Sequence, residues 1–122
     1  MDSLEKIKKI LVEILDIEDQ EIHPETYLVR ELGAESIDLL ELAVELNTIF
    51  NIDVNDDEIF LKNLRADITD GKEKRTNLLK YLAAKFPFLG KTRLEEILAD
   101  LEEGPVLKVK DIASYVEWKH DR

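Results

Sequence analysis

Hydrophobic residues recur every three or four positions over most of the chain, which is the period of helices with one apolar face. No stretch shows the alternating pattern of a half-buried strand. The chain is therefore predicted to fold as a single all-α domain, residues 1–122, with helices that pack as antiparallel neighbours. The predicted helices cover approximately residues 3–15, 34–50, 55–64, 76–86, 92–103 and 109–119.

Two segments break the helical period. Residues 16–32 carry a proline and scattered apolar positions, which predicts a long, packed loop anchored by Ile22, Tyr27, Leu28 and Leu32. Residues 65–75, RADITDGKEKR, combine a glycine with many charges and are predicted to be a flexible connection.

At two predicted helix starts, a pair of polar residues is separated by three positions, as in a capping box. Asn55 with Glu58, and Thr92 with Glu95, resemble the pairs in which two side chains satisfy the free N–H groups of a first turn. Gly104 and Pro105 mark the end of the helix that precedes the last one.

The composition narrows the function. The chain has 122 residues, no cysteine and a net charge of −11, which exclude disulfides and thiolate metal sites and argue against binding nucleic acid. Its start lacks the uninterrupted apolar stretch of a signal peptide, and no run approaches membrane-spanning length. We expect a cytoplasmic protein without a membrane span.

Charge is distributed unevenly along the chain. From Glu31 to Leu61 there are nine acidic residues and no Lys or Arg, whereas from Lys62 to Arg93 nine bases accompany three acids. This asymmetry indicates two regions with different roles, the acidic one suited to a basic partner surface.

The acidic stretch has some features of a calcium loop. Asp53, Asn55 and Asp57 have the spacing of its first three ligands. The sixth position, however, is Glu58 instead of glycine, and the twelfth is Leu64 instead of glutamate. A solvated loop that caps a helix is the better interpretation, and no metal is expected.

Residues for catalysis are few. His23 and His120 have no partner at metal-binding spacing, and no glycine-rich phosphate loop or activated nucleophile is present. The sequence therefore predicts a protein that is not an enzyme.

One stretch does carry a chemical signal. In LGAESIDLLEL, residues 32–42, Ser36 stands where a loop becomes a helix, so its hydroxyl is either a plain helix cap or a group that another enzyme reaches. The residue three positions on is Leu39, which cannot complete a capping box, and Gly33 and Ala34 leave the approach open.

With the preceding YLVREL and the following LNTIFNIDV, this stretch closely resembles the acyl carrier protein family. The likeness covers about residues 4–64 and 107–118. It implies a four-helix bundle in which Ser36 carries 4′-phosphopantetheine, attached by a phosphopantetheinyl transferase. The arm would hold an acyl group as a thioester and present it to acyltransferases and other enzymes of fatty acid or lipid biosynthesis, lipid A included.

The resemblance also implies two sets of contact residues. Partner enzymes with basic docking surfaces would meet the second helix, for which a plain solvated face is the alternative, at Glu35, Asp38, Leu40, Glu41, Val44 and Glu45. An acyl cavity would be lined by residues that are equally explained as the core, namely Leu28, Leu32, Leu42, Leu46, Phe50, Ile59, Ile112 and Val116.

The chain departs from the family pattern in two places. Glu35 and Ile37 replace the usual Asp and Leu around the serine, which affects the choice of transferase. Residues 65–105 form an insertion before the last helix and encode about two additional helices. We hypothesise that the insertion enlarges the acyl site or restricts the partners, as in lengthened carriers of long or hydroxylated chains; a merely stabilising addition is the alternative.

Two other functions fit the same pattern. One is an aminoacyl or aryl carrier of a peptide-synthetase pathway, which uses the same arm. The other is an unmodified helical interaction module in which Ser36 is only a cap. A monomer is expected for a carrier that shuttles between enzymes.

Overall fold

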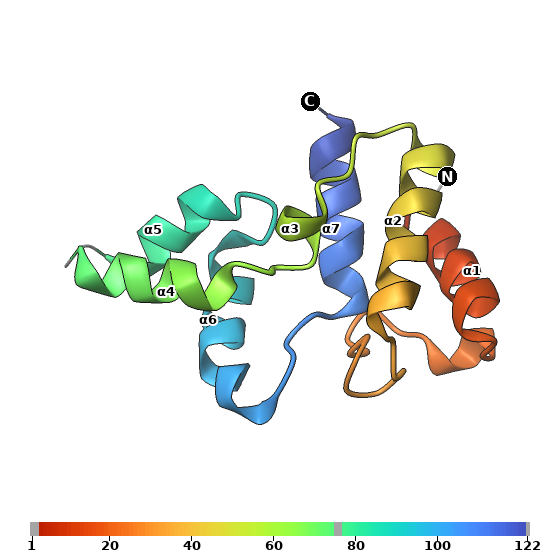
Figure 1. Cartoon of the computed structure of the whole chain (residues 1–122), viewed down its shortest axis with the longest axis horizontal. Helices are drawn as coiled ribbons and strands as arrows, with labels where there is room; N and C mark the ends of the chain where they lie inside the picture. The colour runs from red at the N-terminus through yellow and green to blue at the C-terminus, as the bar shows by residue number, and fades with distance from the viewer. Residues whose placement is uncertain (1–2, 75–76, 122) are drawn as a thin grey trace.

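The computed structural model describes residues 3–74 and 77–121, and the regular elements in these residues are all helical (Figure 1). This confirms the all-α class. Four helices come from the parts that resemble an acyl carrier: α1 (Ser3–Leu15), α2 (Ser36–Phe50), α3 (Asp56–Ile59) and α7 (Val109–His120). The insertion contributes α4 (Leu64–Glu73), α5 (Leu78–Lys85) and α6 (Gly90–Asp100), and short 3-10 turns lie at Asp19–Glu21 and Leu101–Glu103.

The helices form two groups, which lie side by side in Figure 1. In the carrier group, α1 packs against α2 and α7, α2 contacts α7, and the short α3 contacts α7. In the inserted group, α4 packs against α5, and α5 against α6. Among the helices that the structure describes, none is long and apolar enough to cross a membrane.

The boundaries of α1 and α2 follow the predictions from the sequence. After α2, Asn51 adopts a left-handed conformation with φ 54°, which asparagine tolerates better than most residues and which ends the helix. Asn55 caps α3 as predicted, since its side-chain oxygen accepts a hydrogen bond from the Glu58 N–H at 3.2 Å.

The prediction of a flexible connection at residues 65–75 is wrong. Most of it belongs to α4, in which Leu64, Ile68 and Gly71 are buried at helical spacing. A Cβ on Gly71 would lie 2.8 Å from the side chains of Leu78 and Tyr81. The glycine is therefore a point of close approach between α4 and α5, and three helices are inserted where about two were expected.

The capping box predicted for Thr92 and Glu95 is also wrong. Helix α6 begins at Gly90, two residues earlier, so Thr92 already lies inside its first turn. The segment from Phe86 to Leu89 turns tightly, with the Leu89 N–H donating to the Phe86 carbonyl at 3.1 Å. Helix α6 can therefore begin directly after this turn, closer to the N-terminus than predicted.

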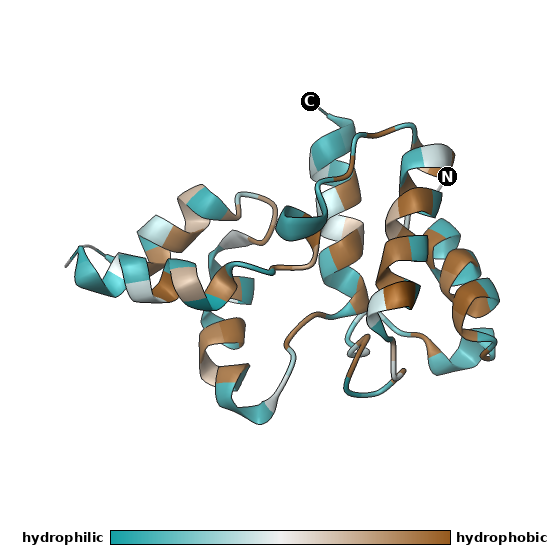
Figure 2. Cartoon of the chain, viewed as in Figure 1, coloured by the Kyte–Doolittle hydropathy of each residue, from teal (hydrophilic) through white to brown (hydrophobic). Residues whose placement is uncertain are grey.

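Apolar side chains from both groups build one core, and aromatic rings join the groups. Phe88, from the insertion, meets Tyr115 of α7 edge-on with ring centroids 5.0 Å apart and lies 5.7 Å from Trp118. The Tyr115 hydroxyl donates to Glu58 at 2.9 Å. Burial, with the Glu58 carboxylate adding to it, raises the pKa of Tyr115 to about 12. Figure 2 shows hydrophobic positions gathered along α1 and the first half of α2.

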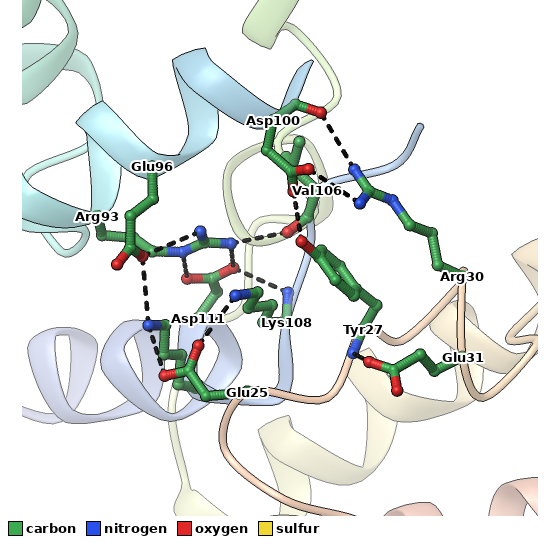
Figure 3. A network of polar contacts seen from close by, with 11 residues as sticks. Glu25, Tyr27, Arg30, Glu31, Arg93, Glu96, Asp100, Val106, Lys108 and Asp111 are labelled. Atoms are coloured by element: carbon green, nitrogen blue, oxygen red, sulfur yellow. Dashed lines mark hydrogen bonds and ion pairs between the residues drawn. The ribbon is translucent and has the colours of Figure 1, made fainter. Parts of the chain in front are cut away.

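A buried ion pair also connects the groups (Figure 3). Arg93 of α6 donates from Nε and Nη2 to the two carboxylate oxygens of Asp111 at 2.7 and 2.8 Å, and to the Val106 carbonyl at 2.7 Å. Asp111 in turn accepts from the Lys108 N–H at the start of α7. Burial lowers the pKa of Arg93, but the hydrogen bonds and charge of Asp111 outweigh it and leave that pKa raised.

A second link holds the end of α6 against the long loop at residues 16–32. Asp100 accepts hydrogen bonds from the Tyr27 hydroxyl and, at 3.0 Å, from Arg30 Nη1. Arg30 first, and then Tyr27, lower the pKa of Asp100. Arg30 Nη2 also donates to the Gly104 carbonyl at 2.9 Å, so the insertion is held at both its last helix and its exit.

Candidate functional site

The start of α2 is capped by Glu35. Its backbone is extended, with φ −101° and ψ 171°, and its N–H donates to Asp38 Oδ2 at 2.8 Å. Asp38 is the residue three positions after Glu35, so this bond is one half of a capping box, and it satisfies the N–H of the residue at the cap position. The alternative in which Ser36 is the cap is therefore wrong, because the capping residues are shifted by one position from those we considered.

Ser36 is the first residue of α2 and is exposed to solvent. Its hydroxyl has no hydrogen-bond partner among the residues that the structure describes. The side chain is thus accessible and is not used by the fold.

A compact turn leads into the helix. Gly33 has φ +69°, a left-handed conformation that glycine adopts without strain, and nothing lies within 4 Å of the position of a Cβ. Ala34 is buried, with its N–H bonded to the Leu28 carbonyl at 3.0 Å. The small residues that the sequence places before Ser36 therefore keep the turn tight and the surface open.

These surroundings fit a phosphate ester on Ser36. The free N–H groups and the dipole of a helix N-terminus stabilise a negative charge. The helix is 15 residues long, so the dipole is fully developed. The Asp38 carboxylate accepts the Glu35 N–H, and the carboxylates of Glu35 and Asp38 oppose a phosphate as neighbouring charges.

The outer face of α2 exposes apolar side chains between acids. Leu40 is 54% and Val44 59% exposed, and Glu41 and Glu45 are exposed as well. Ile37, which is not among the predicted contact residues, is 64% exposed and extends the apolar line toward Ser36. The spacing 37, 40, 44 was the signal for it, since it is a second helical stripe beside the buried one.

Three further positions on or directly before α2 complete this description. Glu35 is exposed next to Ser36, whereas Asp38 is partly buried and directs its carboxylate back to the capping box. Ile49, near the end of α2, is 43% exposed. The described face thus consists of Ile37, Leu40, Glu41, Val44 and Glu45, and we call it the α2 face.

The residues proposed for an acyl cavity are mostly packed in the core. The six fully enclosed members are Leu28, Leu42, Leu46, Ile59, Ile112 and Val116, and all of them are 0 or 1% exposed. Leu32 and Phe50 are partly buried against the same cluster. The structure thus supports the core interpretation for these side chains.

No group of three or more His, Cys, Asp or Glu within residues 3–74 and 77–121 is arranged to hold a metal ion. Asn55, at the centre of the acidic loop, uses its side chain to cap α3. His23 and His120 are both exposed.

Comparison with known families defines the class of protein first: a carrier that bears a phosphopantetheine arm. The family model described as the phosphopantetheine attachment site matches residues 5–66, just over half of the chain. The chain belongs to this family, in agreement with its resemblance to acyl carrier proteins, and its cofactor is 4′-phosphopantetheine. Such a carrier interacts with a phosphopantetheinyl transferase and with the enzymes that use the arm. The match ends where the inserted helices begin.

Proposed function

We propose that Ser36 is the attachment residue, and that the protein carries an acyl group as a thioester on the arm for enzymes of fatty acid or lipid biosynthesis. Lipid A assembly is among the candidate pathways. The observation that carries the proposal is the exposed Ser36 hydroxyl, which lies one residue past the cap position of α2 and has no hydrogen-bond partner among the described residues. The protein itself, a single domain with residues 65–105 inserted in it, performs no reaction.

The chain and the arm divide the chemistry between them. The protein has no cysteine, so the thiol that forms the thioester is supplied by the arm. The contribution of the chain is to anchor the phosphate at the N-terminus of α2 and to display the arm in water. This division supports a carrier that delivers its load to other active sites.

The α2 face supports docking to basic partners. Its exposed apolar side chains offer burial at the centre of a contact, and Glu41 and Glu45 offer charge at its edge. Complementary charge of this kind speeds encounter more than it adds affinity. The strongly acidic character of α2 favours a carrier of fatty acyl groups over an aminoacyl or aryl carrier.

Intact-mass measurement tests the attachment residue. Wild type, Ser36→Ala and Ser114→Ala are each incubated with coenzyme A and a broad-range phosphopantetheinyl transferase. We expect wild type and Ser114→Ala to gain one phosphopantetheine and Ser36→Ala to gain none. A gain by Ser36→Ala, or no gain by wild type with a transferase active on another carrier, would overturn the proposal.

A further inference from the structure

The insertion carries a small apolar groove with basic edges, and we call it the α5 groove. Its floor consists of Leu79 and Ala83, which are partly buried, and its edges are the exposed residues Asn77, Lys80 and Lys91. The volume of the groove is about 350 Å³. Asn77 caps α5, since its side chain accepts the Lys80 N–H at 3.1 Å. The α5 groove therefore runs along the first turns of α5, beside the start of α6.

The charge around the α5 groove is positive throughout. Residues 74–94 contain six Lys or Arg and no Asp or Glu. Neither Lys80 nor Lys91 forms an ion pair with another described residue, whereas Lys108 and Lys110 are both bound by Glu25. The two lysines at the edges of the groove are therefore available to carboxylates of another molecule.

The α2 face has the complementary features. The large apolar side chains that are exposed in the described part of the chain all lie on α2. Leu40 and Val44 are about one helical turn apart and form an apolar ridge, and Glu41 and Glu45 form an acidic ridge beside it. The α2 face thus combines protruding apolar side chains with carboxylates, whereas the α5 groove combines an apolar hollow with ammonium groups.

The two surfaces do not cover each other within one chain. Helix α2 belongs to the carrier group and α5 to the inserted group, and the two groups lie side by side (Figure 1). Leu40 and Val44 are 54% and 59% exposed, and Lys80 is exposed as well. A contact between the α2 face and the α5 groove therefore requires two molecules.

We propose that the α5 groove of one copy of the protein binds the α2 face of a second copy. The apolar ridge of the α2 face packs on Leu79 and Ala83, and its acidic ridge meets Lys80 and Lys91, so the contact has an apolar centre and a charged rim. The contact joins two different faces and is therefore head-to-tail. The inference goes beyond the proposed function, because it needs no group on Ser36.

A second copy fits the α5 groove better than a surface of phosphates does. Lipid headgroups or nucleic acid would match the lysines but leave the concave apolar floor empty, whereas the α2 face fills the floor as well. Two copies with a net charge of −11 each repel at long range. Physiological salt screens this repulsion over about 8 Å and leaves the groups in direct contact to attract.

The proposed contact has a consequence for the carrier. A copy whose α2 face is covered cannot offer that face to a partner enzyme, so self-association competes with docking. The groove is small, and the association is therefore expected to be weak. The monomer expected for a shuttling carrier is then the main form at low concentration.

Sedimentation velocity tests the association. Wild type is measured at physiological salt from low micromolar concentration to about 1 mM, with a reducing agent so that the thiols of attached arms do not link copies. We expect the average mass to rise with concentration, and the rise to disappear in about 1 M salt, where screening acts over about 3 Å. A constant monomer mass over the whole range would overturn the proposal.

Charge-reversed variants identify the two faces. Lys80→Glu alters the α5 groove and Glu41→Lys alters the α2 face, and each is expected to weaken the association about tenfold. Lys72→Glu, at an exposed position of α4 outside the groove, is the matched control and should associate like wild type. A loss in Glu41→Lys alone would mean that two α2 faces pair with each other. An equal loss in Lys72→Glu would mean that net charge governs the association, and either result would overturn the proposal.

A mixture of the two variants tests whether the contact is head-to-tail. Glu41→Lys keeps an intact α5 groove and Lys80→Glu keeps an intact α2 face, so the mixture again contains a matched pair of faces. We expect the equimolar mixture to associate at concentrations at which each variant alone is a monomer. A mixture that sediments as a monomer under these conditions would contradict the proposal.

Vesicles separate a second copy from a lipid surface as the occupant of the groove. Wild type and Lys80→Glu are each centrifuged with vesicles of equal parts phosphatidylcholine and phosphatidylglycerol at physiological salt, and we expect neither to bind. If wild type binds at concentrations below those of self-association, and Lys80→Glu does not, the α5 groove is a site for anionic lipid and the proposal is wrong.

Discussion

Arg93 and Asp111 bring opposite charges into the interior, at 7% and 1% side-chain exposure. They stand 18 positions apart in the sequence, and neither shows a pattern that would predict burial. Removing a charge from water costs several kcal/mol, which is offset only when the partner and the remaining hydrogen bonds are in place. Here Arg93 also has the Val106 carbonyl, and Asp111 the N–H of Lys108.

Asp111→Ala is expected to destabilise the protein by about 3 kcal/mol, because it leaves the buried Arg93 guanidinium with only the longer contact to Glu96, at 3.4 Å, as an acidic partner. Urea unfolding followed by circular dichroism measures the loss. Glu95→Ala removes an exposed carboxylate from α6 and serves as the control, with an expected change within about 0.5 kcal/mol. If the two variants are equally stable, Arg93 is not held by Asp111 in the way described.

At the level of the elements, α4 shows how a residue that usually ends a helix can serve packing. Gly71 is buried where α4 meets α5, and Tyr81 of α5 bonds through its hydroxyl to Asp70 of α4. Sequence periodicity could not identify α4, because its buried face consists of only two large residues and a glycine. This face is buried because α5 packs closely against it at Gly71.

Gly71→Ala tests this packing. Alanine favours the helical conformation over glycine by about 1 kcal/mol, but its Cβ would lie 2.8 Å from the side chains of Leu78 and Tyr81. We expect a net destabilisation of about 1–3 kcal/mol, since the two helices must separate. Thr69→Ala, at an exposed position of the same helix, is the control and should leave stability equal or slightly higher. A stabilised Gly71→Ala would show that α4 and α5 tolerate a wider spacing.

The start of α7 is tied to the long loop by Glu25, which accepts from Lys108 Nζ at 2.9 Å and Lys110 Nζ at 2.8 Å. Hydrogen bonds from Lys110 and then Lys108 lower the pKa of Glu25 from 4.5 to about 2. The stabilisation is therefore present above pH 4.5 and is lost as the pH falls from 4.5 toward 2.

Glu25→Gln should consequently reduce stability at neutral pH and flatten the loss of stability between pH 4.5 and 2. The carboxylate is 65% exposed, so water screens the pair and the effect at neutral pH is at most about 1 kcal/mol. Thermal unfolding at a series of pH values measures it, with Glu13→Gln on the exposed side of α1 as the control. Parallel curves for wild type and Glu25→Gln would contradict the assignment.

At the scale of the whole molecule, the fold separates the two charge regions seen in the sequence. The acidic stretch forms α2, α3 and the loop between them, whereas the basic stretch forms α4, α5 and the start of α6 in the other group (Figure 1). A partner that approaches the α2 face therefore meets the negative charge of Glu41 and Glu45. The separation favours one direction of approach.

Glu41→Lys is expected to slow modification by the transferase about tenfold at low salt, because it reverses charge on the α2 face. The rate of phosphopantetheine gain, followed by intact mass at low and at physiological salt, measures the effect. Glu95→Lys makes the same charge change on α6 and should leave the rate close to that of wild type. A similar slowing in both variants would mean that net charge, not the α2 face, governs the encounter.

The sequence alone determined the all-α class, the extents of α1 and α2, the cap of α3 and the family, because these depend on periodicity and on a short contiguous motif around Ser36. Only the tertiary structure decided that Glu35 is at the cap position of α2, that residues 64–73 are helical, and that Arg93 forms a buried ion pair with Asp111. It also brought Val29 and Leu39 beside residues of the segments 60–65 and 101–107, which together line one groove. The cap is a local choice between Glu35 and Ser36. The others depend on contacts between distant segments, which a local pattern of hydrophobic and polar residues does not record.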